Sequence, residues 1–233
     1  MSAVFKREFK AYFSTPIGYI VLAAFYFFLG LYFYIIYSNG MPNVETTIIA
    51  MSTVAIFTMP VLTMRLMSED RRQKVDQALL TAPVKLSSVV LGKFSAAFAV
   101  YALCFAPTVI FEIIIASNVS VNILTYLYAL LGALLLGGAL ISIGMFISSL
   151  TESSVISAIL TLLVNILVLY MSNFASMINI SWIASIFEKA AFITVFEGFG
   201  ESIFSVGDVV YFISIIAVFV FLSVRSLEKR RWS

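Results

Sequence analysis

The chain has 233 residues, of which 62% are hydrophobic and 11% are charged, with a net charge of +2 and a mean hydropathy of +1.07. A soluble domain is only about half apolar, whereas apolar runs close to the ~20 residues that a helix needs to cross a bilayer recur along this sequence. The composition excludes an ordinary soluble protein and predicts an all-α integral membrane protein, built as one domain over residues 1–233.

Two residue types that serve much of enzyme chemistry are scarce. The chain has no histidine, which is the usual general base and the commonest metal ligand. Its one cysteine, Cys104, lies within an apolar run, so no disulfide can form within the chain. We therefore expect no catalytic residue, no metal site and no cofactor site in this chain.

The first expected element is an amphipathic helix over Val4–Phe13. Aromatic residues recur at helical spacing and charged residues fill the other face; the aromatic residues are Phe5, Phe9, Tyr12 and Phe13. Such a helix lies in the plane of the membrane interface, and Pro16 and Gly18 predict its end. The alternative is a solvated leader.

Six apolar runs between polar breaks are candidate membrane spans. They are Ile17–Tyr37, Thr47–Met64, Phe94–Ala116, Ile123–Leu150, Val155–Asn173 and Val209–Val224. The first run follows basic residues, as in a signal peptide, but it is longer than the apolar part of a signal peptide and no cleavage site is obvious. We expect it to be retained as a span. Arg225 would lengthen the short last span by snorkelling.

The basic residues set the orientation. With six spans, both termini and the segment between the second and third spans share one side, which then holds every Lys and Arg except Lys189. Basic loops stay in the cytoplasm. The sequence predicts a multi-pass plasma-membrane protein with cytoplasmic N- and C-termini.

A charged stretch, Glu69–Asp76, follows the second span. Charges at the bilayer centre would cost about 2.5–3.5 kcal/mol each, so this stretch lies at or beyond the cytoplasmic headgroups. A narrow apolar stripe then recurs at helical spacing, formed by Val75, Ala78, Leu79 and Ala82. Pro83 predicts the end of this helix. Such a helix suits a groove on a partner protein; the alternative is a topogenic loop that packs on its own bundle.

The order Glu-Asp-Arg-Arg at 69–72, Leu-Leu-Thr-Ala-Pro-Val at 79–84 and Val-Val-Leu-Gly-Lys-Phe at 89–94 resembles the permease subunits of ABC-2 type exporters. It is most similar to permeases of gliding-motility-type ABC transporters, and the resemblance covers the whole chain. That family often has Gly-Thr-x-Glu where residues 74–77 read Lys-Val-Asp-Gln.

The resemblance implies a coupling helix that docks in a separate ABC ATPase. The ionic contacts would be Glu69, Asp70, Arg71 and Arg72, and the residues seated in the groove would be Val75, Ala78, Leu79 and Ala82, with Pro83 at the end. It also implies a second permease in a homo- or heterodimer and, in some systems, an accessory subunit with an extracytoplasmic domain. The bilayer is the remaining partner, and no nucleic acid is involved.

A phosphate loop is missing. The only Gly-Lys pair, Gly92-Lys93, has Ser87 where the first glycine belongs and Phe94 where Ser or Thr belongs. The resemblance therefore implies that ATP and Mg are bound by the partner ATPase, whose closure would rock the spans. An apolar, aromatic pathway favours lipid-like or amphipathic cargo.

Two further features flank this core. The outer segment Phe174–Asp208 holds apolar stretches too short to cross, which predict re-entrant helices or, alternatively, a hydrophobic lid. Glu112 is the one carboxylate within a span, either in the transport pathway or as a hydrated structural group.

Two other functions compete with the exporter. A membrane protease or lipid transferase would need histidines or more aspartates than Asp70, Asp76 and Asp208. An ABC complex that transmits force to an extracytoplasmic partner would keep the same architecture. The test between transport and force is whether substrate crosses the bilayer during ATP hydrolysis.

Overall fold

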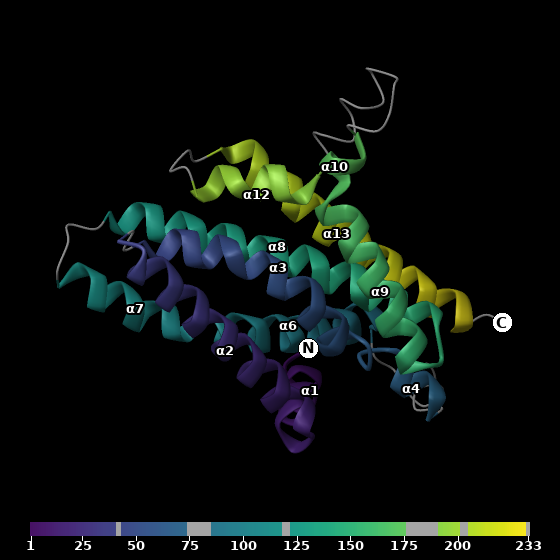
Figure 1. Cartoon of the computed structure of the whole chain (residues 1–233). Coiled ribbons are helices and arrows are strands. Elements are labelled where there is room, and N and C mark those ends of the chain that lie inside the picture. Colours follow the sequence, from purple (N-terminus) through teal and green to yellow (C-terminus); the bar gives the residue numbers. More distant parts are fainter. Residues whose placement is uncertain (41–42, 74–84, 118–121, 176–190, 201–204, 232–233) are drawn as a thin grey trace.

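The computed structural model describes residues 1–40, 43–73, 85–117, 122–175, 191–200 and 205–231 (Figure 1). Every element within these ranges is an α-helix, which confirms the predicted all-α class. The helices are α1 (Ser2–Ser14), α2 (Pro16–Ser38), α3 (Val44–Thr63), α4 (Ser68–Arg72), α6 (Leu86–Cys104), α7 (Ala106–Ala116), α8 (Ile123–Leu150), α9 (Ser154–Leu169), α10 (Met171–Ala175), α12 (Phe192–Gly200) and α13 (Val206–Arg231).

Five helical segments are long and apolar enough to cross a membrane. They are Pro16–Ser38, Val44–Arg72, Leu86–Ala116, Ile123–Leu150 and Val206–Lys229, and they match the first four predicted spans and the last. The predicted fifth span, Val155–Asn173, is not one continuous helix. Its first part, α9, is a shorter apolar helix that ends at Leu169, because Tyr170 leaves the helical conformation (ψ 24°) before α10 begins.

The third candidate span is made of two helices. α6 and α7 meet at Phe105, and Pro107 lies in the first turn of α7, where its missing N–H breaks the hydrogen-bond ladder. α6 also begins earlier than the predicted start at Phe94, so Lys93 lies inside a helix and not in a loop.

α8 forms the centre of the bundle. Its apolar window is 72% buried, against 17% for α2 and 11% for α13, so α2 and α13 present apolar surface outward. Glycines let neighbours approach α8 closely: a Cβ at Gly137 would overlap the Tyr101 ring of α6, and a Cβ at Gly132 would overlap Phe199 of α12. The bundle is therefore built around one helix.

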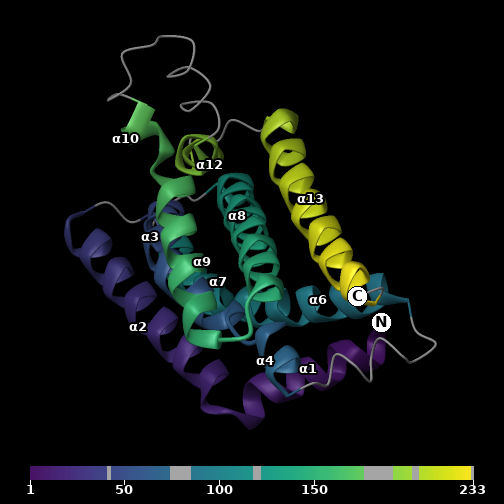
Figure 2. The same ribbon diagram turned by 90° about the vertical axis from the view of Figure 1, so that its right-hand side faces the viewer.

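α8 and α13 run in the same direction. Gly138 lies beside Ile216, and the Phe146 and Phe219 rings are 5.8 Å apart further along both helices. Figure 2 shows these helices between one end that carries α10 and α12 and another that carries α4 and both termini. We call the second end the terminal end.

A helix is present at each of the two flanking segments. α1 packs along the terminal ends of α3 and α6, where buried Tyr12 donates a hydrogen bond to the Leu62 carbonyl at 2.8 Å. α12 covers the opposite end of α8. The interfacial depth of α1 stays a prediction, and so does the re-entrant path of Phe174–Asp208, because residues 176–190 and 201–204 lie outside the described ranges.

Candidate coupling site

The chain turns sharply between α3 and α4, and Ser148 of α8 holds this turn. The Ser148 hydroxyl accepts hydrogen bonds from the Met67 and Ser68 N–H groups, each at 3.1 Å, and donates to the Met64 carbonyl at 3.1 Å. One hydroxyl thus uses its donor and both lone pairs. These bonds satisfy backbone groups at the end of α3 and at the start of α4, and they fix α4 against the terminal end of α8.

Lys93 joins three helices in a buried ion cluster. Its side chain is 2% exposed, and its Nζ lies 3.0 Å from Glu8 Oε1 of α1 and 2.8 Å from Asp70 Oδ2 of α4. Gly92 permits the close approach of α1, because a Cβ there would lie 2.9 Å from the Val4 Cβ. A buried ammonium is tolerated only when it is paired, and two carboxylates pair this one. We call Glu8, Asp70 and Lys93 the Lys93 cluster.

Glu8 remains ionised within the cluster. Burial raises the pKa of Glu8, but Lys93 and Arg7 together lower this pKa by more than burial raises it. The pKa of Glu8 therefore lies below the ordinary value of 4.5. The Arg7 guanidinium donates to Glu8 Oε1 at 2.6 Å, and this bond raises the pKa of Arg7.

The structure gives internal partners to three of the four predicted ionic contacts. Asp70 pairs with Lys93, and Glu69 lies 3.6 Å from Arg65. Arg71 pairs with Glu152 at 2.9 Å and donates to the Leu150 carbonyl at 2.9 Å.

The remaining predicted contacts are Arg72, which is exposed, and the apolar stripe. That stripe (Val75, Ala78, Leu79 and Ala82) and Pro83 lie outside the described residues. Docking of these residues on an ATPase stays a prediction.

Sequence reasoning missed Lys93, Glu8 and Ser148. The sequence indicates Lys93 as a topogenic charge and as part of an incomplete phosphate-loop pattern, and Glu8 as part of the charged face of the first helix. A lysine placed directly after a glycine within a helix was the one available signal, but nothing in the sequence shows which carboxylates reach it.

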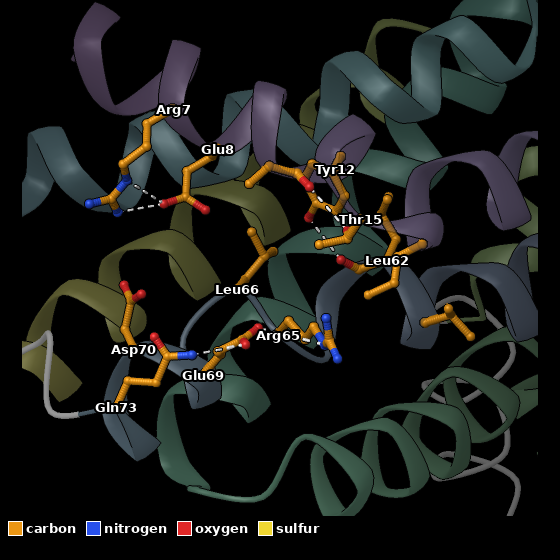
Figure 3. Close-up of a pocket in the computed structure, with 13 residues that line it drawn as sticks. Arg7, Glu8, Tyr12, Thr15, Leu62, Arg65, Leu66, Glu69, Asp70 and Gln73 are labelled. Atoms are coloured by element: carbon orange, nitrogen blue, oxygen red, sulfur yellow. Dashed lines mark hydrogen bonds and ion pairs between the residues drawn. The ribbon is translucent and has the colours of Figure 1, made fainter.

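A pocket of about 360 Å³ opens beside the cluster. Figure 3 shows Arg7 and Glu8 of α1 on one side and Glu69, Asp70 and Gln73 on the other, with Arg65 between α3 and α4. Leu62 and Leu66 form part of its apolar surface. Within the described residues, no cluster of His, Cys, Asp or Glu is suited to hold a metal ion.

Polar groups elsewhere in the bundle are buried without partners. Glu112 of α7 is 8% exposed, and its Oε1 has no hydrogen-bond partner in the described part of the chain. The same holds for Ser157 Oγ, Thr161 Oγ1 and both amide atoms of Asn165, which recur every four residues along one face of α9. A pathway role for Glu112 stays a prediction.

Residues 35–225 of the chain match the sequence profile of a family described as ABC-2 family transporter protein. The match covers more than half of the chain and includes α3 through α12 with most of α13. A comparison with curated proteins found no match.

Proposed function

Because the chain belongs to the ABC-2 family of transporter proteins, we propose that it is the permease subunit of an ABC exporter driven by a separate ATPase. The family match over residues 35–225 is the observation that carries this proposal. The proposed cargo is a lipid-like or amphipathic molecule, in keeping with the apolar surfaces of α2 and α13. A gliding-motility-type complex is the finer assignment favoured by the order of residues at 69–72 and 79–84.

Six crossings are the topology that fits the helix directions. The parallel course of α8 and α13 supports this topology, because the chain between two parallel spans returns across the bilayer. α9, extended by α10, runs between the required ends in Figure 2. Both termini then lie on the side that holds the basic residues, which is the cytoplasmic side.

The Lys93 cluster supports a coupling role for residues 74–84. Asp70 precedes this segment and Lys93 follows it, so the 2.8 Å ion pair joins α4 and α6, the helices on either side of it. Glu8 adds α1 to the same ion cluster. A push from an ATPase on this segment would therefore move α1, α4 and α6 together, and the Ser148 bonds would pass that movement to α8.

A single substitution in the coupling segment tests the docking. Leu79→Asp places a charge in the proposed apolar seat, where it would be desolvated without a partner. We expect normal membrane insertion and loss of ATPase co-purification. Thr81→Asp, which falls away from the stripe, is the matched control and should retain the ATPase.

Equal ATPase recovery with Leu79→Asp and wild type would show that the stripe does not dock. The same complex in vesicles separates the two outputs. ATP-dependent movement of a labelled lipid across the bilayer supports export, while hydrolysis without movement supports force transmission.

A further inference from the structure

A tyrosine of α2 holds the break between α6 and α7. Pro107 has no N–H, so the Leu103 carbonyl, four residues earlier, loses its usual helical donor. That carbonyl accepts a hydrogen bond from the Tyr26 hydroxyl at 2.9 Å, in addition to a backbone N–H at the end of α6. Neighbouring helices are one source of partners for backbone groups that a proline frees within a membrane. Tyr26 therefore stabilises the broken geometry from outside the helix.

A tyrosine of α8 holds the same break from another side. The Thr108 hydroxyl of α7 donates to the Phe105 carbonyl at 2.7 Å, and it lies 3.0 Å from the buried Tyr126 hydroxyl. Because a hydroxyl has only one proton, Tyr126 is the donor and Thr108 the acceptor in this second bond. It ties α7 to α8 within one turn of the break.

The end of α6 is packed firmly on its side of the break. Tyr101 is 1% exposed and donates to the Ala133 carbonyl of α8 at 2.9 Å. Its ring also contacts Phe25 of α2 and Phe105, with ring centroids 6.0 and 5.2 Å away. Contacts with two helices therefore hold the end of α6 in place.

α7 is held less firmly. Three of its residues are buried, and only Ile115 among them is apolar, the other two being Thr108 and Glu112. Beside this buried face, Phe111 stacks on Phe33 of α2 with the ring centroids 4.2 Å apart. Four large apolar side chains of α7 face outward: Val109, Ile110, Ile113 and Ile114. A segment with few buried apolar contacts opens at a low cost in free energy.

We propose that Phe105 is a hinge and that α7 is a gate, which swings away from α8 when the two tyrosine bonds break. Figure 1 shows α7 at the far end of the bundle from α4, which the proposed topology places toward the outer face. Opening uncovers the buried face of α7, including the Glu112 carboxylate. The position in the membrane rests on the proposed function, but the hinge needs no ATPase.

Thiol labelling of Ile115→Cys measures the opening. Ile115 is 1% exposed, so a maleimide reaches a thiol at this position only when α7 has moved. Cys104→Ala removes the one native thiol from every variant. The purified full-length chain is labelled in detergent at a low reagent concentration, at which the rate follows the open fraction.

Four variants test the two tyrosine bonds and the proline. Tyr26→Phe should raise the labelling rate about threefold, the average effect of losing one hydrogen bond between membrane helices. Tyr126→Phe should do the same, and the two together should exceed either alone. Tyr34→Phe is the matched control, because it removes a hydroxyl from α2 at a position that is 71% exposed, and it should leave the rate unchanged. Pro107→Ala restores the missing N–H to the Leu103 carbonyl and should lower the rate below that of wild type.

Two results would overturn the hinge directly. One is an equal rate for Tyr26→Phe and Tyr34→Phe, and the other is a rate that does not fall with Pro107→Ala. Tyr26 is 38% exposed, so its replacement leaves the core intact and decides the test even if Tyr126→Phe unfolds the chain.

Two further variants separate the hinge from other causes. Ala139 is fully buried in α8, so the thiol of Ala139→Cys should stay unlabelled in each tyrosine variant. A parallel rise in labelling at Ala139→Cys and Ile115→Cys would show general unfolding and overturn the hinge. Leu79→Asp should leave the labelling of Ile115→Cys unchanged even though it loses the ATPase, so failure of the docking proposal and failure of the hinge are distinguishable.

Discussion

Replacing Lys93 with methionine should lower the melting temperature of the chain by on the order of 10 °C. The side chain is 2% exposed and has two carboxylate partners, at 3.0 and 2.8 Å. Removing one member of a buried ion pair costs about 3–5 kcal/mol, because the remaining charge stays buried without compensation. For a chain of this length each kcal/mol corresponds to about 2–4 °C. Without Lys93, Glu8 still has Arg7 as a charged partner, so most of the lost stability comes from leaving Asp70 without its ion-pair partner.

The assay is thermal unfolding of the purified chain in detergent, followed by the loss of the monodisperse species. Lys85→Met is the control, since Lys85 is exposed at the start of α6. Adding Glu8→Gln and Asp70→Asn to Lys93→Met removes all three charges and should recover much of the loss. The reasoning is refuted if Lys93→Met melts with the control, or if the triple variant is less stable than Lys93→Met alone.

Two further predictions concern charge and burial. The lowered pKa of Glu8 means that the folded state binds a proton at this carboxylate less readily than the unfolded chain does. The contribution of Glu8 to stability is therefore full above pH 4.5 and is lost as the pH falls through the lower folded pKa. Glu8→Gln should flatten the dependence of the melting temperature on pH in that acidic window, and an unchanged acid response would contradict the assignment. Asn165→Leu should stabilise the chain by about 1–3 kcal/mol, because both amide atoms are buried and find no hydrogen-bond partner among the described residues. A lower melting temperature for this variant would instead show that the amide is hydrogen-bonded in the protein.

The sequence by itself determined the class of this protein. Long apolar runs leave helices as the structure that satisfies the backbone in lipid, so the all-α fold and the five long candidate spans were readable from composition and run length. The break at Tyr170 was not, because nothing in the apolar run Val155–Asn173 marks it. The charges at 69–72 predicted an ionic element outside the hydrocarbon, and the family resemblance rested on the same residues.

Only the tertiary structure decided what those charges do. Asp70 and Arg71 were predicted as contacts for a partner, yet each has an ion-pair partner within the chain, Lys93 and Glu152. Asp70 is separated from Lys93 by the whole coupling segment, and Glu8 comes from α1. Sequence spacing identifies neighbours on one helix, but contacts between helices depend on how the bundle packs around the glycines of α8.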